Sequence, residues 1–133
     1  MSNITITQNS LATVVLADAA FEDGALTFAG AATQVAGTIL ARDSSTLKFV
    51  PFVIGGSTNG NGIPKAILTY DVTAAGAGDI RIRAAVSGQF RKDKLIVAAD
   101  GTGANITAAI LDSLRLYGMT AVSVDELNIA DNS

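Results

Sequence analysis

Residues 37–52 read GTILARDSSTLKFVPF, and the rest of the predicted fold is built around this stretch. The polar residues at 43–45 can reverse the chain, because Asp and Ser side chains hydrogen-bond to nearby backbone groups. Leu47, Phe49 and Pro51 then alternate with their neighbours, so that they share one face of the returning strand. Proline has no N–H to donate, and Pro51 should therefore end the pairing or lie at a sheet edge. The stretch predicts a β-hairpin that starts the main sheet.

Upstream of the hairpin, the sequence predicts two short strands joined by a turn. The first strand covers the consecutive apolar residues at 14–16. The second covers 26–28, where Leu26 and Phe28 alternate with a threonine. The Glu-Asp-Gly sequence at 22–24 is typical of a turn.

Downstream of the hairpin, the longest predicted strand covers 80–90. Its even-numbered positions from 80 to 86 are apolar and should share one face. Gly88 interrupts the pattern, and a glycine inside a strand indicates a bulge or a close approach of backbones. A further strand is expected over 65–71. Its residues on one face are Ala66, Leu68 and Tyr70.

One helix is predicted over 107–117, followed by a last strand over 120–124. Asn105 is the expected N-cap, and Gly118 is well placed to end the helix. An apolar stripe at helical spacing should pack against the sheet. The stripe consists of Ile106, Ala109, Ile110, Leu114 and Tyr117.

The composition is unusual for a free monomer. The 133 residues predict one domain with a substantial core. Apolar residues make up 49% of the chain and charged residues only 16%, against about a quarter in typical proteins. No apolar run is long enough to span a membrane as a helix, and the first residues do not resemble a secretory signal. A chain this apolar predicts an obligate oligomer or a surface covered by a partner.

The residue types exclude several kinds of chemistry. The chain has no cysteine and no histidine, which removes disulfides, thiolates, the usual general base and the commonest metal ligand. The glycine-rich stretch 55–62 lacks the Gly-Lys-Ser/Thr ending of a phosphate-binding loop and is expected to be an exposed, mobile loop. The stretch 100–105 lacks the ligand spacing of a calcium loop. We therefore assign no catalytic, cofactor-binding or metal-ligating residue and expect no enzyme.

The net charge of −3 argues against nucleic acid as the main partner. The charged residues are unevenly distributed along the chain. Arg81 and Arg83 share one face of the predicted strand and could bind an anion. A solvated face, or pairing with acidic residues across an interface, is the favoured interpretation. The end of the chain is acidic over 125–131.

Residues 1–12 are predicted to be an N-terminal arm, and residues 13–133 the domain. The arm contains a short alternation of isoleucine and threonine, which the polar sequence at 8–10 separates from the body. Two interpretations stay open: a frayed terminus, or a strand that pairs only with another protein. The residues concerned are Asn3, Ile4, Thr5, Ile6 and Thr7.

The order of these parts resembles the lambda-type bacteriophage head decoration proteins over about residues 13–124. The strongest marks are the opening hairpin and the sequence AVSGQFR at 85–91, which is followed by Leu95. The helix that ends at Gly118 before a short strand is a further mark. The marks are short, and their order and spacing together carry the resemblance.

The resemblance implies a mainly β (α+β) protein. Its body would be a small β-sandwich or barrel of short strands, with one helix packed near the C-terminus and an N-terminal arm. Such proteins form homotrimers at three-fold positions of the expanded head and hold neighbouring major capsid protein subunits together on the outer surface of the virion. They are made in the host cytoplasm, and no cofactor, nucleic acid or membrane is implied.

The resemblance also implies an arm that becomes ordered by adding to coat-protein β structure, which makes residues 3–7 the candidate capsid-binding residues. The present sequence departs from the family pattern twice. Its arm is short and β-prone rather than long and proline-rich, and the acidic extension after Val124 has no counterpart.

Two other functions are weaker alternatives. The chain could be a phage or cell-surface β module that binds a receptor or carbohydrate, but five Phe, two Tyr and no Trp give few platforms for stacking on sugars. An enzyme built on carboxylates such as Asp71 and Asp79 is the least favoured, although distant residues can converge in a fold.

Overall fold

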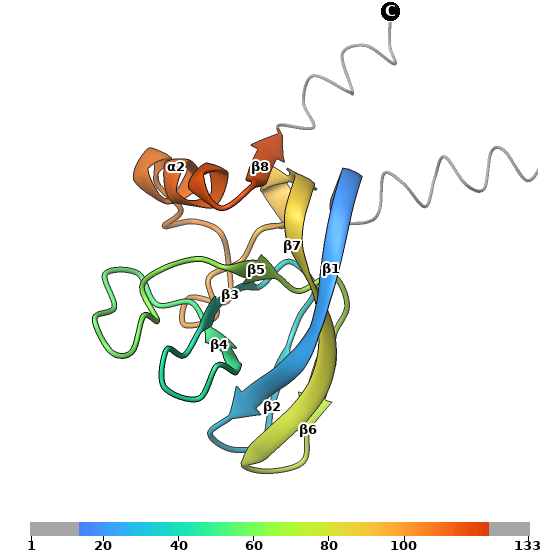
Figure 1. The fold of residues 1–133 in the computed structure, drawn as a ribbon, viewed down its shortest axis with the longest axis vertical. Coiled ribbons are helices and arrows are strands. Elements are labelled where there is room, and N and C mark those ends of the chain that lie inside the picture. Colours follow the sequence, from blue (N-terminus) through green and yellow to red (C-terminus); the bar gives the residue numbers. More distant parts are fainter. Residues whose placement is uncertain (1–13, 123–133) are drawn as a thin grey trace, which may run out of the picture.

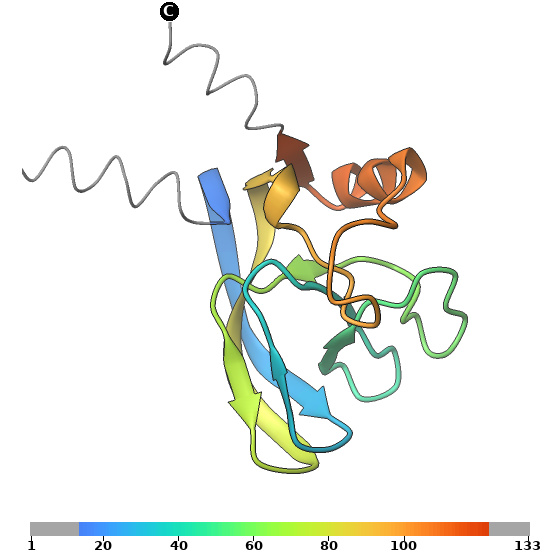
Figure 2. The ribbon, with the colours of Figure 1, turned by 180° about the vertical axis from the view of Figure 1, so that it is seen from behind.

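Two long strands, β1 (Val15–Phe28) and β7 (Gly78–Arg91), dominate the computed structural model, which describes residues 14–122 (Figure 1). They pair antiparallel along their whole length, from Val15 opposite Phe90 to Phe28 opposite Gly78. Together they form a twisted ribbon along one side of the molecule (Figures 1 and 2).

The other strands close this ribbon into a small barrel. The sheet order is β1-β4-β3-β5-β7, and the pairing of β1 with β7 completes the circle. Strand β8 adds to β7 in parallel, and β2 and β6 form a separate two-stranded sheet. The mainly β, barrel-like fold class with one helix near the C-terminus is confirmed, although β1 and β7 are longer than the expected short strands. The bounds are β2 (Ala32–Gln34), β3 (Ile39–Arg42), β4 (Phe49–Pro51), β5 (Ala66–Ile67), β6 (Val72–Ala74) and β8 (Met119–Val122).

The predicted hairpin is present as β3 and β4, which pair antiparallel. The Asp43 carboxylate accepts hydrogen bonds from the backbone N–H of Ser45 and Thr46, as the turn chemistry predicts. Pro51 is the last residue of β4, so it ends the pairing. The prediction that Leu47 lies on the strand face was wrong, because the hairpin turn includes Leu47. The Leu47 N–H donates to the Asp43 carbonyl, and the side chain is 71% exposed.

The predicted turn at 22–24 was wrong, because β1 runs straight through it. Gly24 lies opposite Ile82 of β7. A Cβ atom on Gly24 would lie 2.7 Å from the Phe49 ring. Gly24 therefore makes room for an aromatic side chain rather than for a change of chain direction.

The prediction for Gly88 is confirmed. Its φ angle is +128°, and an added Cβ would lie 2.7 Å from the Ala19 Cα. Three shifts in the register between β1 and β7 fall between Val15 and Phe21, across from Gly88. Glycine allows both the backbone conformation and the close approach at this irregularity.

The helix is α2 (Ala108–Leu116), one residue shorter at each end than the prediction. Its N-cap is Thr107, whose Oγ1 accepts a hydrogen bond from the Ile110 N–H. Asn105 was the wrong choice, because its amide instead donates to the Asp100 carboxylate. Gly118 has φ +87° and ends the helix as predicted. The following strand, predicted at 120–124, begins at Met119.

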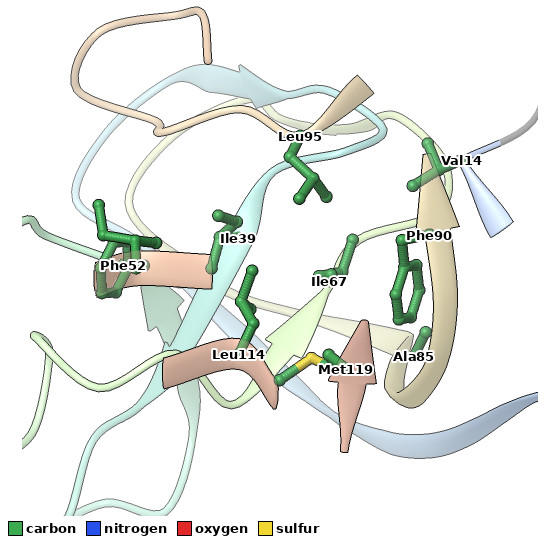
Figure 3. Close-up of a cluster of buried hydrophobic side chains, with 10 residues drawn as sticks. Val14, Ile39, Phe52, Ile67, Ala85, Phe90, Leu95, Leu114 and Met119 are labelled. Carbon is green, nitrogen blue, oxygen red and sulfur yellow. The ribbon is translucent and has the colours of Figure 1, made fainter. Parts of the chain in front are cut away.

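Two hydrophobic clusters lie on opposite faces of the sheet formed by β3, β5 and β7. One fills the barrel and contains Leu40 and Phe49. The other lies beneath α2 and contains Phe90 and Leu114 (Figure 3). Neighbouring residues of one strand enter different clusters, because successive side chains point to opposite faces. The pairs are Ile39 and Leu40, Ala66 and Ile67, and Ala84 and Ala85.

The predicted strand at 65–71 is only partly regular. Strand β5 covers two of its residues. Ala66 and Leu68 do share the barrel interior, as the alternation predicts. Tyr70 does not join them and is 45% exposed. The helix stripe is narrower than predicted. Ile110 and Leu114 are buried and Ile106 packs against the same cluster, as expected, whereas Ala109 and Tyr117 are exposed.

Candidate interaction surfaces

Both segments outside the described residues begin at one end of the body. The predicted capsid-binding residues at 3–7 and the acidic residues at 125–131 fall outside the described range of 14–122. Val15 pairs with Phe90 on one side of β7, and Ala121 pairs with Phe90 on the other. Neighbouring strands lie about 4.8 Å apart, so the two segments start about 10 Å from one another. We call this part of the body the terminal end.

A second surface, the loop flank, gathers most of the exposed large hydrophobic side chains. It lies on the hairpin turn, on the glycine-rich loop and at the end of α2. The hairpin turn and the glycine-rich loop lie on the side of the molecule away from the β1–β7 ribbon, whereas the end of α2 leads into β8 beside β7 (Figures 1 and 2). The loop flank consists of Leu47, Val53, Ile54, Ile63, Leu116 and Tyr117.

Backbone contacts tie the loops of this flank together. The Ser44 N–H donates to the Asn59 carbonyl at 2.9 Å, which joins the hairpin turn to the glycine-rich loop. Within the loop, an added Cβ on Gly62 would lie 2.1 Å from the Gly56 carbonyl oxygen. The glycines therefore allow two loop segments to pack closely, a role that the expectation of a mobile loop did not include.

The end of the loop is joined to the helix by a cation–π contact. The Lys65 Nζ lies 4.0 Å from the centroid of the Tyr117 ring. Beside it, Leu116 is 81% exposed. Between Lys48 and Lys65 the chain carries no charged residue. This uncharged run was the signal in the sequence that could have pointed to an interaction surface here.

Leu47 is held in an unusual conformation at the edge of the loop flank. Its φ angle is +62°, a region that a residue such as leucine rarely adopts. The Asp43 carboxylate fixes the turn by accepting hydrogen bonds from the Ser45 hydroxyl and from the Thr46 N–H. The same hydrogen bonds, led by that from the Ser45 side chain, lower the pKa of Asp43. An ionised carboxylate thus orders a turn that presents an apolar side chain to solvent.

A third surface, the Arg83 patch, consists of Phe21 of β1, Arg83 of β7 and Tyr70 of the β5–β6 connection. The Arg83 guanidinium lies 5.6 Å from the centroid of the Phe21 ring. Its backbone N–H donates to the Tyr70 hydroxyl at 2.9 Å. Arg83 also pairs with Asp23 at 4.0 Å, within the same chain. Among the described residues, Arg81 has no ion pair.

Two features of residues 14–122 bear on acid–base and metal chemistry. An open pocket of about 400 Å³ lies between the β1–β2 connection and the end of β4, but its lining has no titratable side chain. Within residues 14–122, no group of acidic side chains is arranged to hold a metal ion. No helix in that range is long and apolar enough to cross a membrane.

Comparison with known proteins identifies the family. Searches of curated proteins and of solved structures gave no match. The model of the family described as bacteriophage lambda head decoration protein D matches residues 4–118. This match runs from the predicted arm through the barrel to the end of α2. Because it spans most of the 133 residues, the chain belongs to the family of bacteriophage lambda head decoration protein D.

Proposed function

We propose that the protein decorates the expanded phage head as a homotrimer at three-fold positions, where it holds neighbouring major capsid protein subunits together on the outer surface of the virion. The observation that carries this proposal is the family match over residues 4–118. The apolar composition and the exposed loop flank add support, because both are expected of a chain that associates.

The contact with the coat protein is made by the arm at 3–7, as an added β-strand. Burying Ile4 and Ile6 would contribute about 3–6 kcal/mol, whereas ordering five residues costs about 5–10 kcal/mol. Strand hydrogen bonds to the coat protein, at about 0.5–1.5 kcal/mol each, offset the difference. In this arrangement the terminal end of the body faces the head, because the arm begins there.

The test is binding of purified protein to expanded, empty heads of its own virus, with occupancy counted per three-fold site. Deleting residues 2–8 should weaken binding at least tenfold while leaving the thermal midpoint and the mass of the assembly unchanged. A matched pair of variants refines the test. Replacing Ile4 and Ile6 with serine should weaken binding, whereas replacing Thr5 and Thr7 with serine should not.

The outcomes separate the parts of the proposal. If the shortened protein binds heads as tightly as the parent, the arm is not the contact. If the parent leaves the three-fold sites empty, the proposed position on the head is wrong.

A further inference from the structure

We propose that the loop flank of one copy contacts the Arg83 patch of the next copy around the three-fold axis, an inference that rests on the proposed trimer. A ring of three copies closes through one repeated contact between two different patches on each chain. The loop flank and the Arg83 patch are two such surfaces. The hairpin turn and the glycine-rich loop, which carry four of the six loop-flank residues, lie on the opposite side of the body from the β1–β7 ribbon in both views (Figures 1 and 2).

The chemistry of the two surfaces is complementary. The loop flank is mainly aliphatic, and the run from 49 to 64 that supplies half of its residues is uncharged. The centres of protein interfaces are depleted in charged residues in the same way. The Arg83 patch offers two aromatic rings and an arginine, the residue types that dominate interface energetics. Aliphatic side chains can pack on these rings while the arginine stays at their edge.

The loop flank is also ready to bind without rearrangement. The backbone hydrogen bond between Ser44 and Asn59 joins its two loops. Leu47 is already held at positive φ by the turn that Asp43 organises. A surface that is ordered before association loses less conformational entropy on binding.

The position of the two segments outside the described residues favours a second copy over the coat protein. The 13 residues before Val14 and the 11 after Val122 both start at the terminal end. The hairpin turn and the glycine-rich loop lie away from these strand ends (Figure 1). If the terminal end faces the head, the hairpin turn and the glycine-rich loop of the loop flank lie along a side of the body, where a neighbouring copy would sit.

Sedimentation equilibrium of full-length variants tests the contact. Ile54→Lys places a charge in the loop flank, and Phe21→Lys places one beside Arg83. Each variant should sediment with the 13.5 kDa mass of one chain at concentrations where the parent is fully trimeric. Ala75→Lys adds the same charge at an exposed position in the β6–β7 connection and should remain trimeric. Circular dichroism checks that each variant is folded.

Mixing the two patch variants gives a sharper test. An Ile54→Lys copy keeps its Arg83 patch, and a Phe21→Lys copy keeps its loop flank. One intact contact can therefore form between them, but the ring cannot close. An equal mixture at high concentration should contain a species of twice the chain mass that neither variant forms alone. Leu47→Asn is a second loop-flank variant, since asparagine tolerates positive φ, and it should also weaken the trimer at least tenfold.

Each failure has a distinct meaning. A parent that sediments as a single chain at every concentration would overturn the proposed trimer itself. A trimeric parent with equally trimeric Ile54→Lys and Leu47→Asn variants would overturn the assigned contact. The proposed decoration of the head would not be affected. Variants that stay trimeric but no longer bind heads would show that the loop flank faces the coat protein instead. A mixture without the heavier species would overturn the pairing of these two surfaces.

Discussion

At Gly88 the backbones of β1 and β7 approach so closely that no side chain fits. An added Cβ would lie 2.7 Å from the Ala19 Cα and 3.0 Å from the Ala17 carbonyl oxygen, and the backbone has φ +128°. Strain and steric overlap therefore act together at one residue. We expect Gly88→Val to lower the free energy of unfolding by about 2–4 kcal/mol.

Urea denaturation monitored by circular dichroism measures this effect. Gly76→Val is the matched control, because an added Cβ at Gly76 meets no atom within 4 Å. The control should have a denaturation midpoint close to that of the parent. A Gly88→Val midpoint equal to that of the control would show that β1 and β7 can separate locally at no cost.

Asp79, which lies near the tip of the β1–β7 ribbon, makes the stability of the folded state depend on pH. Its carboxylate accepts hydrogen bonds from the Lys48 Nζ at 2.5 Å and from the Thr27 hydroxyl at 2.9 Å. These hydrogen bonds, led by that from Lys48, lower the pKa of Asp79. Because the pKa is lower in the folded state, the stabilisation is present above the unfolded value of about 3.9 and is lost as the pH falls through the folded value.

We predict that Asp79→Asn loses less stability than the parent when the pH is lowered. Urea midpoints measured at about pH 7 and about pH 3 should fall further in the parent than in Asp79→Asn. Added salt should reduce the difference between the two proteins, since the ion pair with Lys48 is exposed to screening. Equal losses in both proteins at low salt would mean that this pair does not contribute.

At the scale of the element, the sequence best predicts structures that are determined by residues close together in the chain. The hairpin β3–β4 was predicted because Asp43 organises its turn from within a few residues. The length of β1 was not, because the role of Gly24 depends on Phe49, which is distant in sequence and occupies the space of the missing side chain. The N-cap was misplaced by two residues, since Asn105 and Thr107 are both good capping residues and only the fold selects between them.

Helix α2 contributes to stability through Leu114, which is fully buried in the cluster shown in Figure 3. Leu114→Ala should lower the free energy of unfolding by about 2–5 kcal/mol, because it leaves a cavity between α2 and the sheet. Leu116 lies two residues away on the same helix and is 81% exposed, so Leu116→Ala is a matched control with little effect on unfolding when both changes are made in the single-chain Ile54→Lys background. Thermal or urea denaturation compares the two, and similar midpoints would mean that the buried face of α2 has been misassigned.

At the scale of the whole molecule, the family could be predicted from the order of the elements, but the full set of residues in the loop flank could not, although the uncharged run between Lys48 and Lys65 marks part of it. Its side chains come from three segments that are distant in sequence, and the Ser44–Asn59 hydrogen bond and the Lys65–Tyr117 contact are among the interactions that join them. The sequence showed an apolar excess without showing where it lies. In the folded chain, six of the exposed large hydrophobic side chains belong to the loop flank.

This arrangement predicts that stability depends on protein concentration. If the loop flank is covered only in the trimer, association stabilises the folded chain by mass action. For three chains that dissociate on unfolding, raising the concentration about 100-fold stabilises each chain by about 1.8 kcal/mol. The thermal midpoint of the parent should therefore rise by several degrees between about 1 and 100 µM.

Calorimetry or circular dichroism across this concentration range measures the rise in the midpoint. The rise should vanish in Ile54→Lys, whose single chains unfold without dissociating, and it should persist in Ala75→Lys. Deletion of residues 2–8 should leave the rise intact, because the arm is assigned to the head and not to the neighbouring copy. A rise that disappears with the arm would instead mean that residues 2–8 join the copies to one another, and the proposed contact with the coat protein would lose its basis.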